Sequence, residues 1–258
     1  MSQTPLLGRP VWCELLTSDV KAAESFYATV VGWTVAPFDP GGGYDILKRP
    51  GDGRGIGGAM KIPDGMNVPP HWAMYLGVPN LDAAVAQITR LGGSTLSELH
   101  DMPEVGRFQA MKDPQGAVFS ILEPAPKSPE TPETQPEPGD VSWRELYTTD
   151  AAAAVKFYSD VFGWRESQAM DMGPMGKYHI IARAFDIGGI MNTPKDMAQM
   201  PPAWGLYFCV SGLDAAIERV KGNGGQVLNG PMEVPGGDRI VNCMDPQGAM
   251  FSLHERKG

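Results

Sequence analysis

The stretch Trp12-Cys13-Glu14-Leu15 occurs twice in this chain, because Trp143-Arg144-Glu145-Leu146 repeats it at a shift of 131 residues. The similarity continues downstream, where GRPVWCELLTSDVKAAESFYATVVGWTV (residues 8–35) lines up with GDVSWRELYTTDAAAAVKFYSDVFGWRE (residues 139–166). A repeat this long is a duplicated domain, since solenoid repeats have periods of about 20–50 residues. The 258-residue chain is therefore predicted to hold two copies of one domain.

Both copies are predicted to contain the same order of strands and helices. In the first copy a buried strand precedes a helix whose apolar residues fall on one stripe, and Gly32 ends that helix. A second strand–helix–strand pattern follows in the same copy. Strands are expected at 11–16, 33–38, 44–48, 57–62, 72–78, 95–99, 108–112 and 117–122, and the second helix at 81–91. Each copy thus consists of two βαβββ modules, and the fold class is α+β.

A segment rich in proline and glutamate separates the two copies. It covers residues 126–139 and has no apolar periodicity, so an extended, semi-rigid linker is expected. The predicted domains are residues 1–125 and 140–258. Each is about 120 residues long, which is enough to bury a core without disulfides or metals.

Composition and charge narrow the class of partner. The net charge of −9 offers no basic surface for nucleic acid or an anionic membrane. No apolar run reaches the length of a membrane span, and the first residues do not follow the pattern of a secretory signal. The three cysteines form no CxxC motif, which is typical of a reducing compartment. We expect a cytoplasmic protein whose partner is a small molecule, with a second copy of the chain as a further candidate partner.

Three motifs occur in the same order in both copies. They are Phe26-Tyr27 with Gly32-Trp33, the helix start Leu81-Asp82-Ala83-Ala84, and the turn and strand Asp113-Pro114-Gln115-Gly116 to Ser120. In this order and spacing the chain resembles the vicinal oxygen chelate superfamily, which includes glyoxalase I, bleomycin-resistance proteins and extradiol dioxygenases. More narrowly, it looks like the two-domain glyoxalase-like or hydroxylase branch. The resemblance implies that paired βαβββ modules form two half-open barrels around cavities.

Active members of this family bind a divalent metal through His, Glu or Gln, so the matching positions can be compared. In this sequence they hold Trp12 and Trp143, Ala73 and Gly205, Ser120 and Ser252, and the stretches 57–60 and 188–191. Tryptophan cannot coordinate a metal, and serine is a poor ligand for zinc, nickel or iron. The four histidines, His71, His100, His179 and His254, do not occupy matched positions. We therefore predict no metal site and no cofactor.

The first strand of each copy carries a tryptophan and a glutamate that share one face, because side chains alternate along a strand. A carboxylate facing an apolar cavity tends to have a raised pKa and can serve as a general base or a ligand anchor. A tryptophan offers a flat face for an aromatic ligand. The candidate catalytic residues are Glu14 and Glu145, and the candidate substrate-binding residues are Trp12, Tyr75, Trp143 and Tyr207. The alternative is structural: each glutamate bonds a tyrosine hydroxyl or backbone amides and holds two modules in register.

Other residues have two interpretations each. Arg107 and Arg239 occupy matched positions and could bind a carboxylate or form surface ion pairs. Tyr44 and Tyr178 could line the cavities or be ordinary half-buried strand aromatics. Several loop methionines could form an adaptable lid over each cavity or simply pack within surface loops. These methionines are Met66, Met170, Met172, Met175, Met197 and Met200.

Three functions follow from these residues. The first is a metal-independent enzyme, of hydroxylase or lyase type, that acts on a hydrophobic or aromatic compound with Glu14 or Glu145 as base. The second is a protein that sequesters such a compound without chemistry, as the bleomycin-resistance relatives do. The third is an association scaffold with vestigial cavities.

Overall fold

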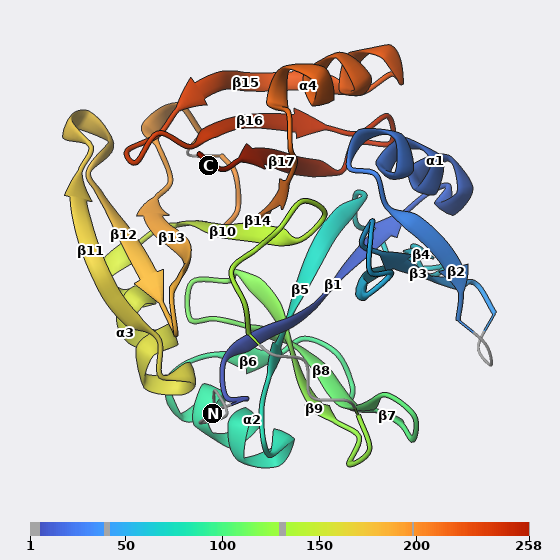
Figure 1. The fold of residues 1–258 in the computed structure, drawn as a ribbon. Coiled ribbons are helices and arrows are strands. Elements are labelled where there is room, and N and C mark those ends of the chain that lie inside the picture. Colours follow the sequence, from blue (N-terminus) through green and yellow to red (C-terminus); the bar gives the residue numbers. More distant parts are fainter. Residues whose placement is uncertain (1–5, 39–41, 129–132, 198, 258) are drawn as a thin grey trace. The chain divides into compact units, whose positions relative to one another are not determined.

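A computed structural model describes residues 6–38, 42–128, 133–197 and 199–257, and Figure 1 labels its elements. The predicted linker lies partly outside the described residues, at 129–132. The first copy contains β1 (Arg9–Thr17), α1 (Val20–Val30), β2 (Thr34–Pro37), β3 (Tyr44–Lys48), β4 (Gly55–Lys61), β5 (His71–Gly77), α2 (Leu81–Arg90), β6 (Ser94–Thr95), β7 (His100–Met102), β8 (Gly106–Lys112) and β9 (Val118–Pro124).

The second copy repeats this order. It contains β10 (Val141–Thr148), α3 (Ala151–Phe162), β11 (Arg165–Asp171), the short 3₁₀ helix η1 (Gly173–Met175), β12 (Lys177–Ala182), β13 (Asp186–Asn192), the 3₁₀ helix η2 (Lys195–Met197), β14 (Ala203–Cys209), α4 (Leu213–Gly222), β15 (Gln226–Glu233), β16 (Arg239–Met244) and β17 (Met250–Glu255).

The strands of each copy belong to one sheet. The runs β2-β3-β4-β1 and β5-β9-β8-β6 make up a nine-stranded sheet with β7 paired to β8, and the runs β11-β12-β13-β10 and β14-β17-β16-β15 make up an eight-stranded sheet. Within each run the first strand of a module pairs in parallel with its last, as β1 does with β4 and β10 with β13. The predicted α+β fold with a tandem duplication of βαβββ modules is confirmed.

The strand expected at 95–99 is wrong in extent, because β6 ends at Thr95. The N–H groups of Leu96 and Ser97 both donate to the carbonyl oxygen of Ala110, at 2.8 and 3.4 Å. The ladder cannot continue in register when two residues face one partner. The chain pairs with β8 again only at β7.

Residue contacts divide the chain into two compact units. Unit 1 consists of Met1–Val11, Met74–Gln135 and Arg144–Trp204, and unit 2 consists of Trp12–Ala73, Pro136–Trp143 and Gly205–Gly258. Each unit therefore combines one module from each sequence copy. The pattern of the sequence leaves open whether modules pair within or across the copies, and the contacts pair them across.

A buried tyrosine joins the two modules of unit 2. The hydroxyl of Tyr27, on α1, donates to Asp245 Oδ2 at 3.1 Å and accepts from Trp72 Nε1 at 2.9 Å. Asp245 also accepts the backbone N–H groups of Gln247 and Ala249, which holds the turn between β16 and β17. Burial and the charge of Asp245 raise the pKa of Tyr27 well above its usual range, so its hydroxyl stays protonated and keeps donating.

Unit 1 contains the same device. The hydroxyl of Tyr158, on α3, donates to Asp113 Oδ2 at 3.2 Å and accepts from Trp204 Nε1 at 2.9 Å. The ring of Tyr158 also stacks on Trp164, with centroids 5.2 Å apart. Burial raises the pKa of the Asp113 carboxyl, while its hydrogen bonds to the turn and to Tyr158 oppose that rise.

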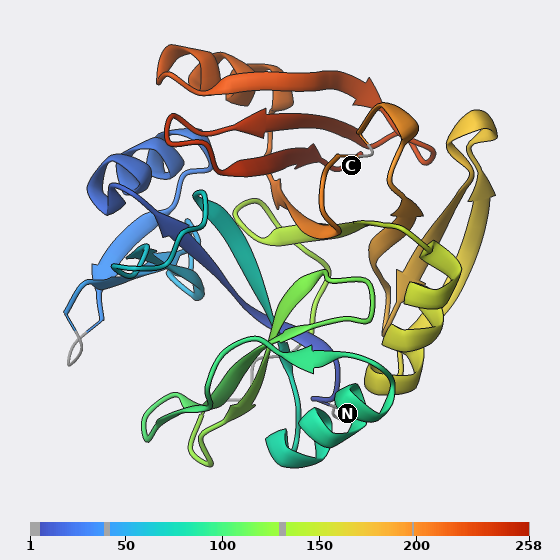
Figure 2. The same cartoon turned by 180° about the vertical axis from the view of Figure 1, so that it is seen from behind.

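The glutamine of each Asp-Pro-Gln-Gly turn holds the start of a helix in its own unit. Gln247 Oε1 accepts the N–H of Asp19 at 2.7 Å, and its Nε2 donates to the Asp19 carbonyl at 2.9 Å. In unit 1, Gln115 Nε2 donates to the carbonyl of Asp150 at 3.0 Å. Asp19 and Asp150 are the N-cap residues of α1 and α3. Figures 1 and 2 show α1 and α4 close together in unit 2, where Arg219 of α4 donates to the carbonyl of Val30 at the end of α1 at 3.0 Å.

The described ends of the linker are held by side chains. Glu133 pairs with Arg183 at 3.0 Å, and both side chains are 7% exposed. In unit 2, Trp33 Nε1 donates to the carbonyl of Gly139 at 2.8 Å. Gly139 has φ +93° and packs so closely on Arg49 and Pro50 that a Cβ would lie 2.6 Å from the proline ring. Only glycine fits this contact.

We expect Tyr158→Phe and Tyr27→Phe each to lower the free energy of unfolding by about 1–3 kcal/mol, because the change leaves a buried indole N–H and a carboxylate oxygen without their partner. Urea denaturation measures this loss. Thr34→Val, at an exposed position at the start of β2, is the control and should change the free energy by less than about 0.5 kcal/mol. A loss in the tyrosine variants no larger than in the control would contradict the assignment.

Candidate functional site

The glutamate of each first strand lies on the sheet face opposite the helix. In unit 2, β1 presents Leu15 and Thr17 to the core with 1% and 0% exposure. Glu14 points to the other face and is half-buried. It lies opposite Gly58 in the parallel pairing of β1 with β4. Trp12 shares the face of Glu14 by alternation, as the sequence predicts.

A tyrosine from β3 lies across this face in unit 2. Tyr44 Oη accepts a hydrogen bond from Trp12 Nε1 at 2.8 Å. The position of the ring depends on Gly58, because a Cβ at that residue would lie 2.1 Å from Tyr44 Oη. The pairing of a strand glycine with a tyrosine therefore makes room for the aromatic ring on the face of Glu14.

Unit 1 carries the same pairing of a strand glycine with a tyrosine. Glu145 is 7% exposed and lies opposite Gly189 in the pairing of β10 with β13. The Tyr178 hydroxyl, on β12, donates to Glu145 Oε1 at 2.8 Å. A Cβ at Gly189 would lie 2.1 Å from Tyr178 Oη. A buried carboxylate is costly unless it is hydrogen-bonded, and Tyr178 supplies one of the bonds that Glu145 needs.

A second tyrosine of unit 1 bonds the same carboxyl group. Tyr147 follows Glu145 by two residues on β10, so the two side chains share a face. Burial first, and then the charge and hydrogen bond of Glu145, raise the pKa of Tyr147 above its usual range. The phenol therefore stays protonated and acts as a donor toward Glu145. The first copy has Leu16 at this position, so this donor belongs to the second copy.

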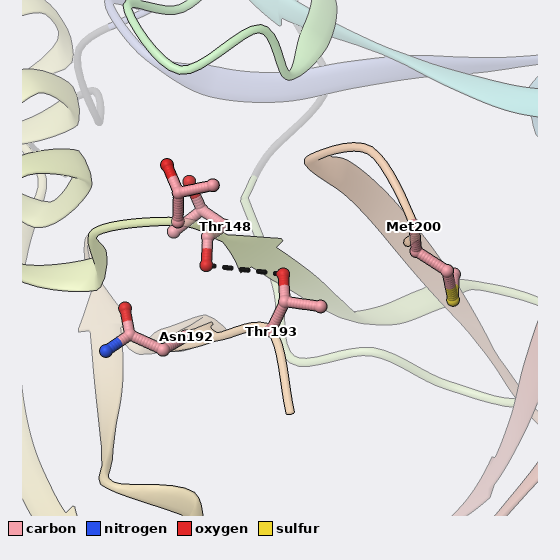
Figure 3. Close-up of a pocket in the computed structure, with 5 residues that line it drawn as sticks. Thr148, Asn192, Thr193 and Met200 are labelled. Atoms are coloured by element: carbon pink, nitrogen blue, oxygen red, sulfur yellow. Dashed lines mark hydrogen bonds between the residues drawn. The ribbon is translucent and has the colours of Figure 1, made fainter. Parts of the chain in front are cut away.

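A pocket of about 260 Å³ lies at the carboxyl ends of β10 and β13 in unit 1. Figure 3 shows it between the end of β10, the residues after β13 and the loop that carries Met200. Thr193 Oγ1 donates to the carbonyl of Thr148 at 3.3 Å, and the Thr193 N–H donates to the same oxygen at 2.8 Å. The lining residues are Thr148, Thr149, Asn192, Thr193 and Met200.

The other predicted binding residues are divided between the units. Tyr75 belongs to unit 1, where it is 9% exposed and its ring lies 6.1 Å from that of Phe108. Trp143 and Tyr207 belong to unit 2, whereas Glu145 belongs to unit 1. Tyr207 Oη accepts from Asn242 Nδ2 at 3.5 Å, and the same amide donates to Ser252 Oγ at 2.8 Å. The Ser252 hydroxyl, at a position where relatives hold a metal ligand, thus already accepts a hydrogen bond.

Arg107 and Arg239, which occupy matched positions in the two copies, both form ion pairs with carboxylates of the protein. Arg107 pairs with Asp82 at 2.9 Å and with Glu123 at 3.5 Å. Arg239 repeats the arrangement with Asp214 at 2.7 Å and Glu255 at 3.2 Å. These contacts join the start of a helix to the strands behind it.

Unit 2 also contains a row of three hydrogen-bonded polar residues that the sequence pattern does not predict. His254 bonds Ser142 Oγ through Nδ1 and Asp238 Oδ2 through Nε2, both at 2.9 Å. The three residue types are those of a hydrolytic triad. Ser142, however, is 4% exposed and donates its hydroxyl to the carbonyl of Tyr207 at 3.2 Å. We interpret the row as a structural tie between β10, β14 and β17.

We expect Asp238→Asn to weaken this tie at neutral pH only. Burial would raise the pKa of Asp238, but the backbone N–H of Lys257 and the His254 ring outweigh it and lower the pKa. A carboxyl group whose pKa is lower in the folded state stabilises the protein at a pH above its unfolded-state pKa. This stabilisation is lost as the pH falls through its folded-state pKa. The free energy of unfolding of the wild type should therefore exceed that of the variant at pH 7. The difference should be less than about 1 kcal/mol, because Asp238 is partly exposed and solvent screens its charge.

Thermal denaturation from pH 2 to 8 measures this difference, which should vanish at the acid end. Asp64→Asn, at an exposed position, is the control and should show little difference at any pH. A wild-type advantage that grows toward acid pH would contradict the interpretation.

The three cysteines are buried thiols outside any disulfide bond. Burial raises the pKa of Cys209 to about 11 and that of Cys243 to about 12. The thiolate is the nucleophilic form of cysteine, so these two thiols are poor candidates for covalent catalysis. Glu145 remains the better candidate for chemistry.

The donor set does not fit the metal of the family. Among the described residues, no group of three or more His, Cys, Asp or Glu side chains is placed to hold an ion. The positions matched to the family ligands hold Trp, Ala, Gly and Ser, and Ser252 already accepts from Asn242. That no metal binds at these positions stays a prediction. Within the described chain, no helix is long and apolar enough to span a membrane.

These features define a duplicated α+β protein with a carboxylate on the face opposite the helix in each copy. Residues 141–253 match the model of the Glyoxalase/Bleomycin resistance protein/Dioxygenase superfamily, and residues 12–122 match that of a glyoxalase-like domain. The chain belongs to the glyoxalase/bleomycin resistance/dioxygenase superfamily, as the motifs of the sequence indicate.

Curated relatives match over nearly the whole chain. "Putative glyoxylase CFP32" of Mycobacterium tuberculosis is 31% identical over 95% of this chain and 94% of its own length. The anthracycline biosynthesis protein DnrV of Streptomyces peucetius is 30% identical over 96% of this chain and 93% of its own length. Among solved structures, the Mn(II)-bound glyoxalase of Novosphingobium aromaticivorans has a TM-score of 0.68 at 18% identity, over 96% of this chain and 82% of that one. This last likeness concerns the fold alone.

Proposed function

We propose that this protein binds a hydrophobic or aromatic small molecule on the face that carries Glu145 and acts on it without a metal. The observation that carries the proposal is the buried carboxylate of Glu145, 7% exposed and bonded by the Tyr178 hydroxyl at 2.8 Å. The anthracycline biosynthesis relative supports a polycyclic aromatic ligand. The cysteine thiols outside any disulfide bond support the cytoplasm as the place of action.

Glu145 is the residue proposed as the base. Its two phenol partners, Tyr178 and Tyr147, orient the carboxylate and hold it in a water-poor environment. The carboxylate takes a proton from an acidic O–H or C–H bond of the ligand, and the electron pair of that bond stays on the ligand. The proton then returns to another atom of the ligand, or a leaving group departs with the electron pair. Such isomerase or lyase chemistry needs no oxidant, whereas a hydroxylation requires dioxygen and an electron donor.

The remaining predicted residues have supporting roles in this proposal. Trp143 precedes Glu145 by two residues on β10, so its indole faces the same side and can stack on an aromatic ring. Glu14 and Trp12 are proposed to bind a ligand on the corresponding face of the first copy. Tyr75 and Tyr207 are proposed to contact a ligand in their own units. A second copy of the chain remains a proposed partner.

Sequestration without chemistry is the second candidate. It is favoured by the same hydrogen bond, because a carboxylate held by Tyr178 can anchor a ligand hydroxyl without moving a proton. The two functions differ in one outcome: a sequestering protein releases its ligand unchanged. A scaffold with vestigial sites binds no aromatic ligand at either face.

We expect Glu145→Gln to lower turnover of a bound hydroxyanthraquinone or naphthol by about 10²–10⁴, the usual contribution of a general base, and to change its affinity less than tenfold. Tryptophan fluorescence reports binding, and chromatography of the ligand reports turnover. Glu98→Gln, at an exposed position, is the matched control and should leave both unchanged. Glu14→Gln tests the first copy.

Each outcome bears on one function. Equal turnover in Glu145→Gln and wild type would reject Glu145 as the base. Tight binding with an unchanged ligand would establish sequestration instead. A metal bound at one ion per chain and required for turnover, by elemental analysis and chelation, would reject the metal-independent reaction.

A further inference from the structure

The pocket at the ends of β10 and β13 lies three to four residues beyond Glu145 along the chain of β10. Thr148 lies opposite Asn192 at the end of the parallel pairing. The Thr193 N–H extends the ladder by one step to the Thr148 carbonyl. Thr149 and Thr193 are the first residues after β10 and β13, and both line the pocket. A ligand that extends from Glu145 along β10 to its carboxyl end therefore reaches the pocket, whose lining residues Figure 3 shows.

The lining of this pocket is polar and uncharged. Its five residues are three threonines, an asparagine and a methionine. Within the described part of the chain, the hydroxyl of Thr149 and the amide Nδ2 of Asn192 make no hydrogen bond to another residue, and both side chains are exposed. Thr193 Oγ1 donates to Thr148, so its lone pairs remain to accept. The pocket thus presents donors and acceptors together, which is what a ligand hydroxyl group requires.

The start of α3 does not turn this pocket into an anion site. The Ala151 N–H donates to Asn192 Oδ1 at 2.7 Å, and the Ala153 N–H donates to Asp150 Oδ1 at 3.0 Å. Two of the helix donors that attract anions are therefore occupied. The Asp150 carboxylate adds a negative charge beside them. A neutral ligand group fits this environment better than a phosphate or carboxylate.

The size and the apolar part of the lining narrow the ligand further. The volume of about 260 Å³ corresponds to the share of roughly eight or nine waters at ~30 Å³ each, which accommodates a ring-sized substituent. Met200 adds a deformable apolar surface, suited to the C–H face of such a ring. The first copy has Lys61 and Ile62 where the second has Asn192 and Thr193, so the neutral polar lining is a property of the second copy.

We infer that this pocket is a subsite for a neutral, hydroxyl-rich substituent, so the ligand is an aromatic glycoside or a similar polyhydroxylated aryl compound. The inference rests on the proposed function, because Glu145 receives the aromatic part. Thr149 and Thr193 select the hydroxylated part through hydrogen bonds. Met200 packs on its carbon skeleton.

The test compares two probes on the full chain: 1,5-dihydroxynaphthalene and its mono-β-D-glucoside, which keeps one free phenol. We expect the glucoside to bind about tenfold more tightly, which corresponds to about 1.4 kcal/mol of binding free energy shared by two neutral hydrogen bonds. In Thr149→Val/Thr193→Val this tenfold advantage should disappear while the affinity for the aglycone stays the same. Thr34→Val is the matched control and should retain the advantage. Thermal denaturation verifies that the double variant is folded.

The outcomes separate the subsite from the proposed function. An aglycone that binds, with a glucoside that binds no more tightly, overturns the subsite alone. A glucoside advantage that survives in a folded double variant also overturns it. Binding of neither probe to wild type overturns both the proposed function and the subsite. Glu145→Gln should weaken both probes alike and leave their ratio near tenfold.

Discussion

A tyrosine hydroxyl held between an indole N–H and an aspartate oxygen is the interaction on which each unit depends. In unit 2 it connects α1 of the first copy, through Tyr27, with Asp245 of the second. In unit 1 it connects Tyr158 with Asp113 in the same way. All of these groups lie in an apolar interior where water cannot replace a lost partner, so the bonds favour one pairing of modules over others. The contact decides which module each helix packs against.

One face of each sheet packs against a helix, so the side chains of the opposite face are the ones available to a ligand. In unit 1, Leu146 and Ile190 are fully buried on the side of α3. Glu145 consequently points the opposite way, and Gly189 leaves room for Tyr178 to reach it. The carboxylate obtains one hydrogen bond from Tyr178 on β12, the strand on the far side of β13. Packing on the helix side therefore determines the environment of the proposed base.

The two copies differ where a ligand would meet them and agree where the modules meet each other. The buried Tyr27 and Tyr158 have the same partners, and the strand glycines seat Tyr44 and Tyr178 alike. The changes fall on the face that carries the glutamate and just beyond its strands: Leu16 becomes Tyr147 and Ile62 becomes Thr193. A duplicated core tolerates little variation because its side chains interlock, whereas the ligand-facing residues are free to diverge.

The sequence by itself determined the duplication, the βαβββ order of each module and the shared face of Trp12 and Glu14, because repeats and strand alternation are local properties. It also indicated the boundaries of β3, which agree with the structure. The pairing of modules across the copies, the Tyr178–Glu145 bond and the pocket beside Thr193 were decided only by tertiary structure. These join residues from different strands, and the short β6 likewise reflects Ala110 of another strand. Periodicity along one segment carries no information about which distant segment completes its hydrogen bonds.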